Sequence, residues 1–213
     1  MRVLLGLCLV LLLGGCNRVH SDHPLFFADA SADAPRLRDG LWVIDNGDSA
    51  DCRYDARKPV TRWPGCADWM LVRGGEVLGY DPPGKGDVTG VGEWTSLSVV
   101  LSAGDPPVLQ IGMTGDGKVD YQFFGIEPTA GGGGAITAFA SWPVMCGPPP
   151  PGGAMEGGKR RFVTLEPLPG LTVIDESSCT AADAAAVRNA AGPSRAWAGK
   201  EAGGARWVRD GYP

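Results

Sequence analysis

Residues 108–126 of the 213-residue chain read VLQIGMTGDGKVDYQFFGI, and this stretch decides the fold class. Two apolar runs flank a turn at 114–117, and its Asp-Gly pair is typical of the tight turns that join antiparallel strands. After the turn, Val119, Tyr121 and Phe123 alternate with polar residues, which is the pattern of a strand with one buried face. The stretch therefore predicts an antiparallel β-hairpin.

The same pattern of short apolar runs between turn residues continues along most of the chain. Glycine (33 residues) and proline (18 residues) are abundant and gather between the runs, which indicates many turns and short strands. The fold class that follows is mainly β, with an antiparallel sheet arranged as a sandwich or a barrel. The expected strands are 41–45, 69–73, 76–80, 96–102, 108–113, 118–126, 135–142, 161–165 and 171–174.

Helical structure is expected only as a short C-terminal segment. Thr180 is a candidate N-cap with Asp183 three residues later, and an alanine-rich run continues to Ala191. The Gly-Pro pair that follows is expected to end this helix, and a second short helix is expected at 194–204. After it, the apolar residues at 207–208 are expected to rejoin the sheet.

The first sixteen residues contain an export signal. Arg2 is followed by an apolar run that is too short to cross a bilayer, and small residues precede Cys16. The box Leu13-Gly14-Gly15-Cys16 resembles the signal of bacterial lipoproteins, which a dedicated peptidase cleaves. The resemblance implies that cleavage after Gly15 leaves Cys16 with a diacylglycerol thioether and an N-acyl chain. Because each buried methylene contributes about 0.8 kcal/mol, these chains would hold the protein stably on a membrane.

The same resemblance implies a location. In lipoproteins of Gram-negative bacteria an aspartate after the lipidated cysteine favours the inner membrane, and here the residue is Asn17. We therefore expect a membrane-anchored, periplasm-facing protein, with the outer membrane favoured over the inner. The expected organisation is a signal peptide at 1–15, a lipid-anchored tether at 16–38 whose Phe-Phe pair at 26–27 docks on the domain, and one β-rich globular domain at 39–213.

Cysteine usage agrees with export. After the signal is removed and Cys16 is acylated, the remaining cysteines are Cys52, Cys66, Cys146 and Cys179. Four thiols in an oxidising compartment predict two disulfides, for which three connectivities are possible. The turn-like Trp-Pro-Gly sequence before Cys66 favours Cys52 with Cys66 and Cys146 with Cys179. Zinc is the alternative, but no Cys-x-x-Cys or histidine spacing supports it.

The globular part has few of the groups that enzymes use. Both histidines, His20 and His23, lie in the expected tether, so the Gly-Asp-Ser sequence at 47–49 has no histidine after it to act as the base of an esterase. The Gly-x-x-x-x-Gly-Lys run at 79–85 is followed by glycine where a phosphate-binding loop needs Ser or Thr. We expect no catalytic residue, metal site or cofactor, and no enzymatic activity. A carboxylate pair, as in a glycan hydrolase, is the enzymatic alternative.

Charge limits the partners. The chain has 24 acidic and 19 basic residues, and removal of the signal takes away one arginine and no acid. Since this excess of negative charge repels nucleic acid, we expect none as a partner. The expected partners are the membrane, through the lipid anchor, and an envelope protein or a small apolar ligand.

The sequence Gly40-Leu41-Trp42 resembles the Gly-x-Trp start of lipocalins and of small barrel-shaped protease inhibitors of Gram-negative bacteria. In those inhibitors a disulfide follows, as Cys52 and Cys66 do here. The leading hypothesis is a lipid-anchored envelope lipoprotein with a non-enzymatic binding or scaffolding role, and the alternative is a lipocalin-like carrier or inhibitor-like barrel. A carrier needs a lined internal cavity, whereas a scaffold needs an exposed apolar patch with a polar rim.

Overall fold

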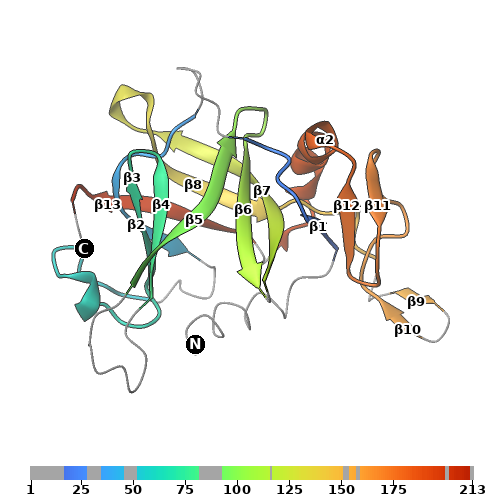
Figure 1. The fold of residues 1–213 in the computed structure, drawn as a ribbon, viewed down its shortest axis with the longest axis horizontal. Helices are drawn as coiled ribbons and strands as arrows, with labels where there is room; N and C mark the ends of the chain where they lie inside the picture. The colour runs from blue at the N-terminus through green and yellow to red at the C-terminus, as the bar shows by residue number, and fades with distance from the viewer. Residues whose placement is uncertain are drawn as a thin grey trace.

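Eight antiparallel strands form a closed barrel, and further strands and one helix pack beside it (Figure 1). The prediction of a mainly β fold with a short helix near the C-terminus is therefore confirmed, and the arrangement is a barrel. The computed structural model describes residues 17–27, 35–45, 52–81, 93–115, 117–150, 154–156, 159–199 and 202–211.

Successive hairpins build most of the barrel. Each strand from β2 to β8 pairs with the next along the chain, and β13 inserts between β8 and β2 to close the ring. The C-terminal apolar pair at 207–208 thus rejoins the sheet as expected. The barrel strands are β2 (Gly40–Asp45), β3 (Asp68–Arg73), β4 (Glu76–Asp81), β5 (Glu93–Ser102), β6 (Val108–Gly115), β7 (Lys118–Ala130), β8 (Ile136–Pro143) and β13 (Gly203–Arg209).

Apolar side chains fill the barrel interior. Because side chains alternate between the two faces of a strand, every second residue points inward. The rings of Trp42 and Phe139 lie inside with their centroids 5.9 Å apart, and Trp42 is fully buried. An eight-stranded barrel is just wide enough for such filling. The buried members of this core are Trp42, Met70, Val72, Val77, Leu109, Ile126, Ile136, Phe139 and Ala205.

One end of the barrel is closed around Gly40. The indole N–H of Trp42 donates to the carbonyl of Arg38 at 2.8 Å, and the Arg38 guanidinium lies 3.7 Å from the centre of the Trp207 ring. Gly40 has φ +127°, and a Cβ there would lie 2.4 Å from the carbonyl oxygen of Arg209. Only glycine fits this position, which explains the glycine at the start of the Gly-x-Trp sequence.

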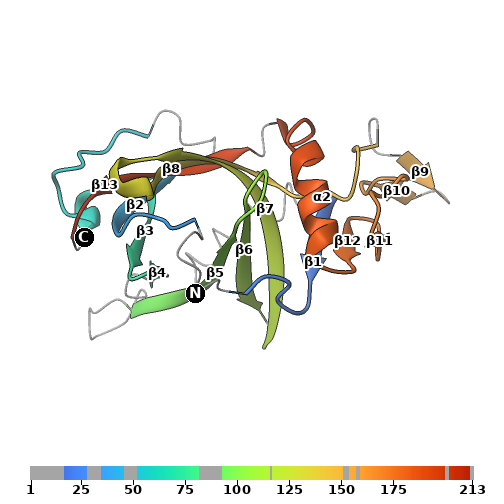
Figure 2. The ribbon, with the colours of Figure 1, turned by 90° about the horizontal axis from the view of Figure 1, so that it is seen from above.

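Strand β7 extends the sheet beyond the barrel. One of its edges pairs with β6, while the other pairs first with β1 (Arg18–Ser21) and then, from Phe124 onward, with β8. Parallel to β1 runs β12 (Ser178–Ala181), and β11 (Leu171–Val173) pairs with β12 at the outer edge. We call β1, β11 and β12 the annex (Figure 2).

A second core lies between the annex, the outer face of β7 and the helix α2 (Ala184–Ser194). Phe123 and Val187 are buried in it, and the Phe26 ring packs edge-on against Phe123 at 6.0 Å. The buried amide of Gln110, on the outer face of β6, accepts hydrogen bonds from the N–H groups of Leu25 and Phe26 and donates to the carbonyl of Phe26. These bonds hold the N-terminal segment against the barrel.

The expected tether at 16–38 is wrong for the described residues 17–27. Residues 18–21 form a strand in the sheet, because their backbone groups find partners on both β12 and β7. Phe26 docks on the domain as expected and is 3% exposed, whereas Phe27 is 73% exposed.

Local expectations near the C-terminus need two corrections. Asp183 rather than Thr180 caps the helix, since its carboxylate accepts from the Ala186 N–H at 2.9 Å. The helix also continues through Gly192 and Pro193 to Ser194, whose buried hydroxyl donates to the Ala190 carbonyl and secures the last turn. After α2, residues 195–197 form turns and Gly199 has 3-10 geometry, while β13 begins at Gly203, so the described part of 194–204 contains no second α-helix.

The segment that precedes β11 in the chain also differs from expectation. The predicted strand at 161–165 is wrong beyond Arg161, because Phe162 and Val163 both donate to the Glu176 carbonyl and turn away from a ladder. Strand β10 (Lys159–Arg161) instead pairs with β9 (Ala154–Glu156) in a separate two-stranded sheet.

The Gln110 contacts give a stability prediction. Gln110→Leu should lower the free energy of unfolding by about 3 kcal/mol, because buried N–H and carbonyl groups lose their partners. Gln122→Leu is the control and should cost less than about 1 kcal/mol, since the contact of this half-buried amide among the described residues is a long one of 3.5 Å with Asp120. Urea unfolding of both variants measures the difference. Equal losses would contradict the role given to Gln110.

Candidate binding surface

A disulfide-closed loop covers part of the outer face of the barrel. Cys52 and Cys66 bond at the two ends of the loop, with their Cα atoms 5.9 Å apart. Inside the loop the indole N–H of Trp63 reaches the carbonyls of Asp55 and Lys58, and the rings of Trp63 and Tyr54 lie 4.4 Å apart. The loop packs through its short 3-10 helix η1 (Val60–Arg62) and neighbours onto Leu41 and Val43 of β2.

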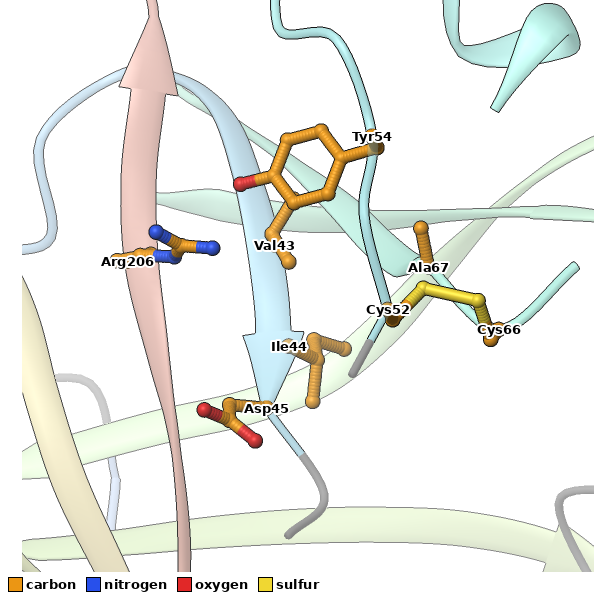
Figure 3. A pocket seen from close by; sticks show the side chains of 8 residues that line it. All are labelled: Val43, Ile44, Asp45, Cys52, Tyr54, Cys66, Ala67 and Arg206. Carbon is orange, nitrogen blue, oxygen red and sulfur yellow. A yellow bond between two sulfur atoms is a disulfide. The ribbon is translucent and has the colours of Figure 1, made fainter. Parts of the chain in front are cut away.

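A small pocket opens between this loop and strands β2 and β13 (Figure 3). Its volume is about 80 Å³, which is well below the several hundred Å³ of a typical small-molecule site. The Arg206 guanidinium lies 5.5 Å from the Tyr54 ring centre, and the Asp45 carboxylate stands at the end of β2. Glycan hydrolysis needs two carboxylates, whereas this lining contains one. The pocket is lined by Val43, Ile44, Asp45, Cys52, Tyr54, Cys66, Ala67 and Arg206.

Three aromatic rings form a cluster on the other side of the loop. Trp69, Tyr80 and Trp94 come from the neighbouring strands β3, β4 and β5 and are all half-buried. Trp69 stacks on Tyr80 with 5.7 Å between centroids, and Trp94 lies 5.7 Å from Trp69 and 5.3 Å from Tyr80. Trp69 pairs with Val43 of β2, whose side chain faces outward under the loop, so the cluster is on the outer face.

Polar groups border this aromatic cluster. Ser96 and Ser98 follow Trp94 on the same face of β5 and are exposed. The combination of a half-buried aromatic surface and a hydroxyl rim is typical of surfaces that bind another molecule. The sequence alone does not predict this cluster. The three residues do lie in or beside expected strands, but only the register between the strands brings them together.

The second disulfide has different surroundings. Cys146 and Cys179 bond in the core beside α2, and both are fully buried. The connectivity favoured from the sequence is thus the one in the structure for both pairs.

Cys16 lies outside the described residues. His20 Nδ1 lies 2.9 Å from Asp120 Oδ2, and His23 lies beside Asp22, whose pKa this contact lowers.

Comparison with known proteins found no relative. No protein-family model, curated protein or solved structure matches the chain. In the part of the chain that the structure describes, no helix is long and apolar enough to cross a membrane. Within the same described ranges, His, Cys, Asp and Glu side chains form no group of three or more that suits a metal ion.

The two disulfides should differ in their access to reductant. Cys66 is exposed and Cys52 half-buried, whereas Cys146 and Cys179 are fully buried, so mild thiol treatment should open the 52–66 bond first. Alkylation and mass mapping during reduction measure the order, and simultaneous opening would contradict it.

Replacing Cys52 and Cys66 together with serine should lower the free energy of unfolding by about 3 kcal/mol for a loop of this length.

Proposed function

We propose that this protein is a lipid-anchored, non-enzymatic binding protein of the bacterial cell envelope, and that a partner protein docks on the outer face of its barrel. The lipid-box sequence ending at Cys16 and the two disulfides support a position outside the cytoplasm. The docking surface is the aromatic cluster of Trp69, Tyr80 and Trp94 with the adjoining 52–66 loop.

The packing of the barrel interior favours a binding site on the outer surface over an internal one. The barrel interior holds a packed core that includes Trp42 and Phe139, while another aromatic group of three residues lies outside. Aromatic side chains are enriched at protein interfaces because they bury much apolar area and lose little conformational freedom. A packed interior and an aromatic outer face are what a scaffold needs.

A carrier of a small apolar ligand is the second candidate, and one residue favours it. Leu97 of β5 lies two residues from the core residue Val99 and so faces the interior, where a Cβ on Gly79 would lie 3.6 Å from its side chain. Leu97 is nevertheless 39% exposed. An apolar inward-facing side chain that contacts solvent would suit a ligand held at that end of the barrel.

The anchor is tested by Cys16→Ser. Because the proposed thioether cannot form on serine, the variant should leave the membrane fraction and appear in the soluble envelope fraction. Cys8→Ser is the matched control, since Cys8 lies in the segment that cleavage would remove, and it should stay with the membrane. Intact-mass spectrometry reads acylation directly. A Cys16→Ser protein that remains membrane-bound would refute the anchor.

The docking surface is tested by photo-crosslinking in cells. With p-benzoylphenylalanine in place of Tyr80, we expect a protein adduct of one defined mass, whereas the same probe in place of the exposed Val119 should give none. Native mass spectrometry of the wild-type protein provides the second readout. A bound small molecule together with no adduct at position 80 would favour the carrier instead.

A further inference from the structure

We propose that the globular body rests directly on the phospholipid bilayer through an apolar patch next to the anchor, formed by Phe162, Leu165 and Ile174. We call these three residues the anchor-side patch. The inference rests on the proposed acylation of Cys16 and adds the orientation that the protein takes on the membrane.

Asn17 has no freedom to act as a spacer. It is 1% exposed, and its side chain donates to the Gly147 carbonyl at 2.8 Å and accepts from the Thr164 N–H at 2.8 Å. Its backbone N–H donates to the Ser177 carbonyl, and its own carbonyl accepts from the Cys146 N–H at 2.9 Å. Four hydrogen bonds therefore fix the residue that follows the proposed anchor.

The proposed anchor is one residue away from Asn17 along the chain. Consecutive Cα atoms are about 3.8 Å apart, so an acylated Cys16 lies within one residue of a fixed point on the folded body. Glycerol and acyl carbonyl groups of such an anchor reside at the bilayer interface. The surface around Asn17 must then be at the interface as well, because no flexible segment separates it from the lipid.

The surface around Asn17 carries exposed apolar side chains. Among the described residues six large apolar side chains are exposed, and three of them are Phe162 (42%), Leu165 (60%) and Ile174 (58%). Phe162 and Leu165 flank Thr164, which bonds to Asn17, and the Phe162 N–H donates to the Glu176 carbonyl beside Ser177. Half of the exposed large apolar side chains thus lie within three residues of a partner of Asn17.

The chain next to the patch carries charged residues of both signs. In the sequence, basic residues occupy 159–161 directly before Phe162, while Glu166, Asp175 and Glu176 are acidic. Partial burial acts to raise the pKa of Asp175, but hydrogen bonds from Ser177 and Ser178 outweigh it and lower that pKa. With both signs present, insertion of the apolar side chains rather than attraction to anionic lipid drives the contact.

The contact also defines which way the molecule points. Strands β1 and β12 run parallel, and both begin at the patch, next to Asn17 and Ser177. The helix α2 begins shortly after β12 ends, so its first turn lies at the opposite end of the annex (Figure 1). The bilayer therefore lies at the end of the annex that carries the β9–β10 hairpin.

Photo-crosslinking to lipid tests the patch in the acylated full-length protein. The probe is p-benzoylphenylalanine in place of Leu165 or Ile174, with Phe27 as the matched control because it is apolar, 73% exposed and follows the far end of β1. Each protein is reconstituted in vesicles of phosphatidylethanolamine and phosphatidylglycerol and irradiated. We expect phospholipid adducts at positions 165 and 174 and none at position 27. The adduct yields should stay unchanged when phosphatidylglycerol is omitted.

Intact mass of the same samples separates the two proposals. Acylated protein without adducts at 165 and 174, or with equal adducts at 27, would overturn the patch while leaving the anchor in place. Adduct yields that fall without phosphatidylglycerol would overturn apolar insertion as its cause. Unacylated Cys16 would overturn the anchor and, with it, the orientation.

Discussion

Sharing of one long strand between two sheets is the constraint on which this structure depends. Strand β7 has 13 residues, and its backbone groups pair with β6 along one edge and with β1 and then β8 along the other. Because unpaired strand edges are unfavourable when buried, barrel closure and the annex are built together. The inward side chains of β7 join the barrel core, and its outward side chains, such as Phe123, join the core under α2.

The barrel separates the two surfaces to which we assign functions. The annex joins the barrel at β7, whereas the aromatic cluster lies on β3, β4 and β5, across the ring in the strand order (Figure 1). An anchor at residue 16 would therefore leave the aromatic cluster and the 52–66 loop free to meet a partner. The disulfides follow the same division, because one closes the loop on the barrel and the other ties the annex to the segment after β8.

Tight contacts at single residues hold these parts in register. The indole N–H of Trp142 in β8 donates to the Ala191 carbonyl of α2 at 2.7 Å, and a Cβ on Gly125 would lie 2.5 Å from that indole nitrogen. A glycine in β7 thus gives the Trp142 ring room to lie flat over the strand. Gln110 holds the N-terminal segment in place in a similar way, since its one buried amide satisfies three backbone groups of that segment.

Local patterns in the sequence determined the strand-rich class and most strand positions, because alternation and turn residues act between near neighbours. They favoured, among three possible connectivities, the disulfide pairing that the structure contains. They did not predict β1, since its four residues, Arg-Val-His-Ser, have no apolar alternation and are strand only because β7 and β12 offer partners from distant positions. The burial of Asn17 and the meeting of Trp69, Tyr80 and Trp94 likewise depend on register across the sheet. Tertiary structure alone decided them, because such contacts join residues that no local spacing relates.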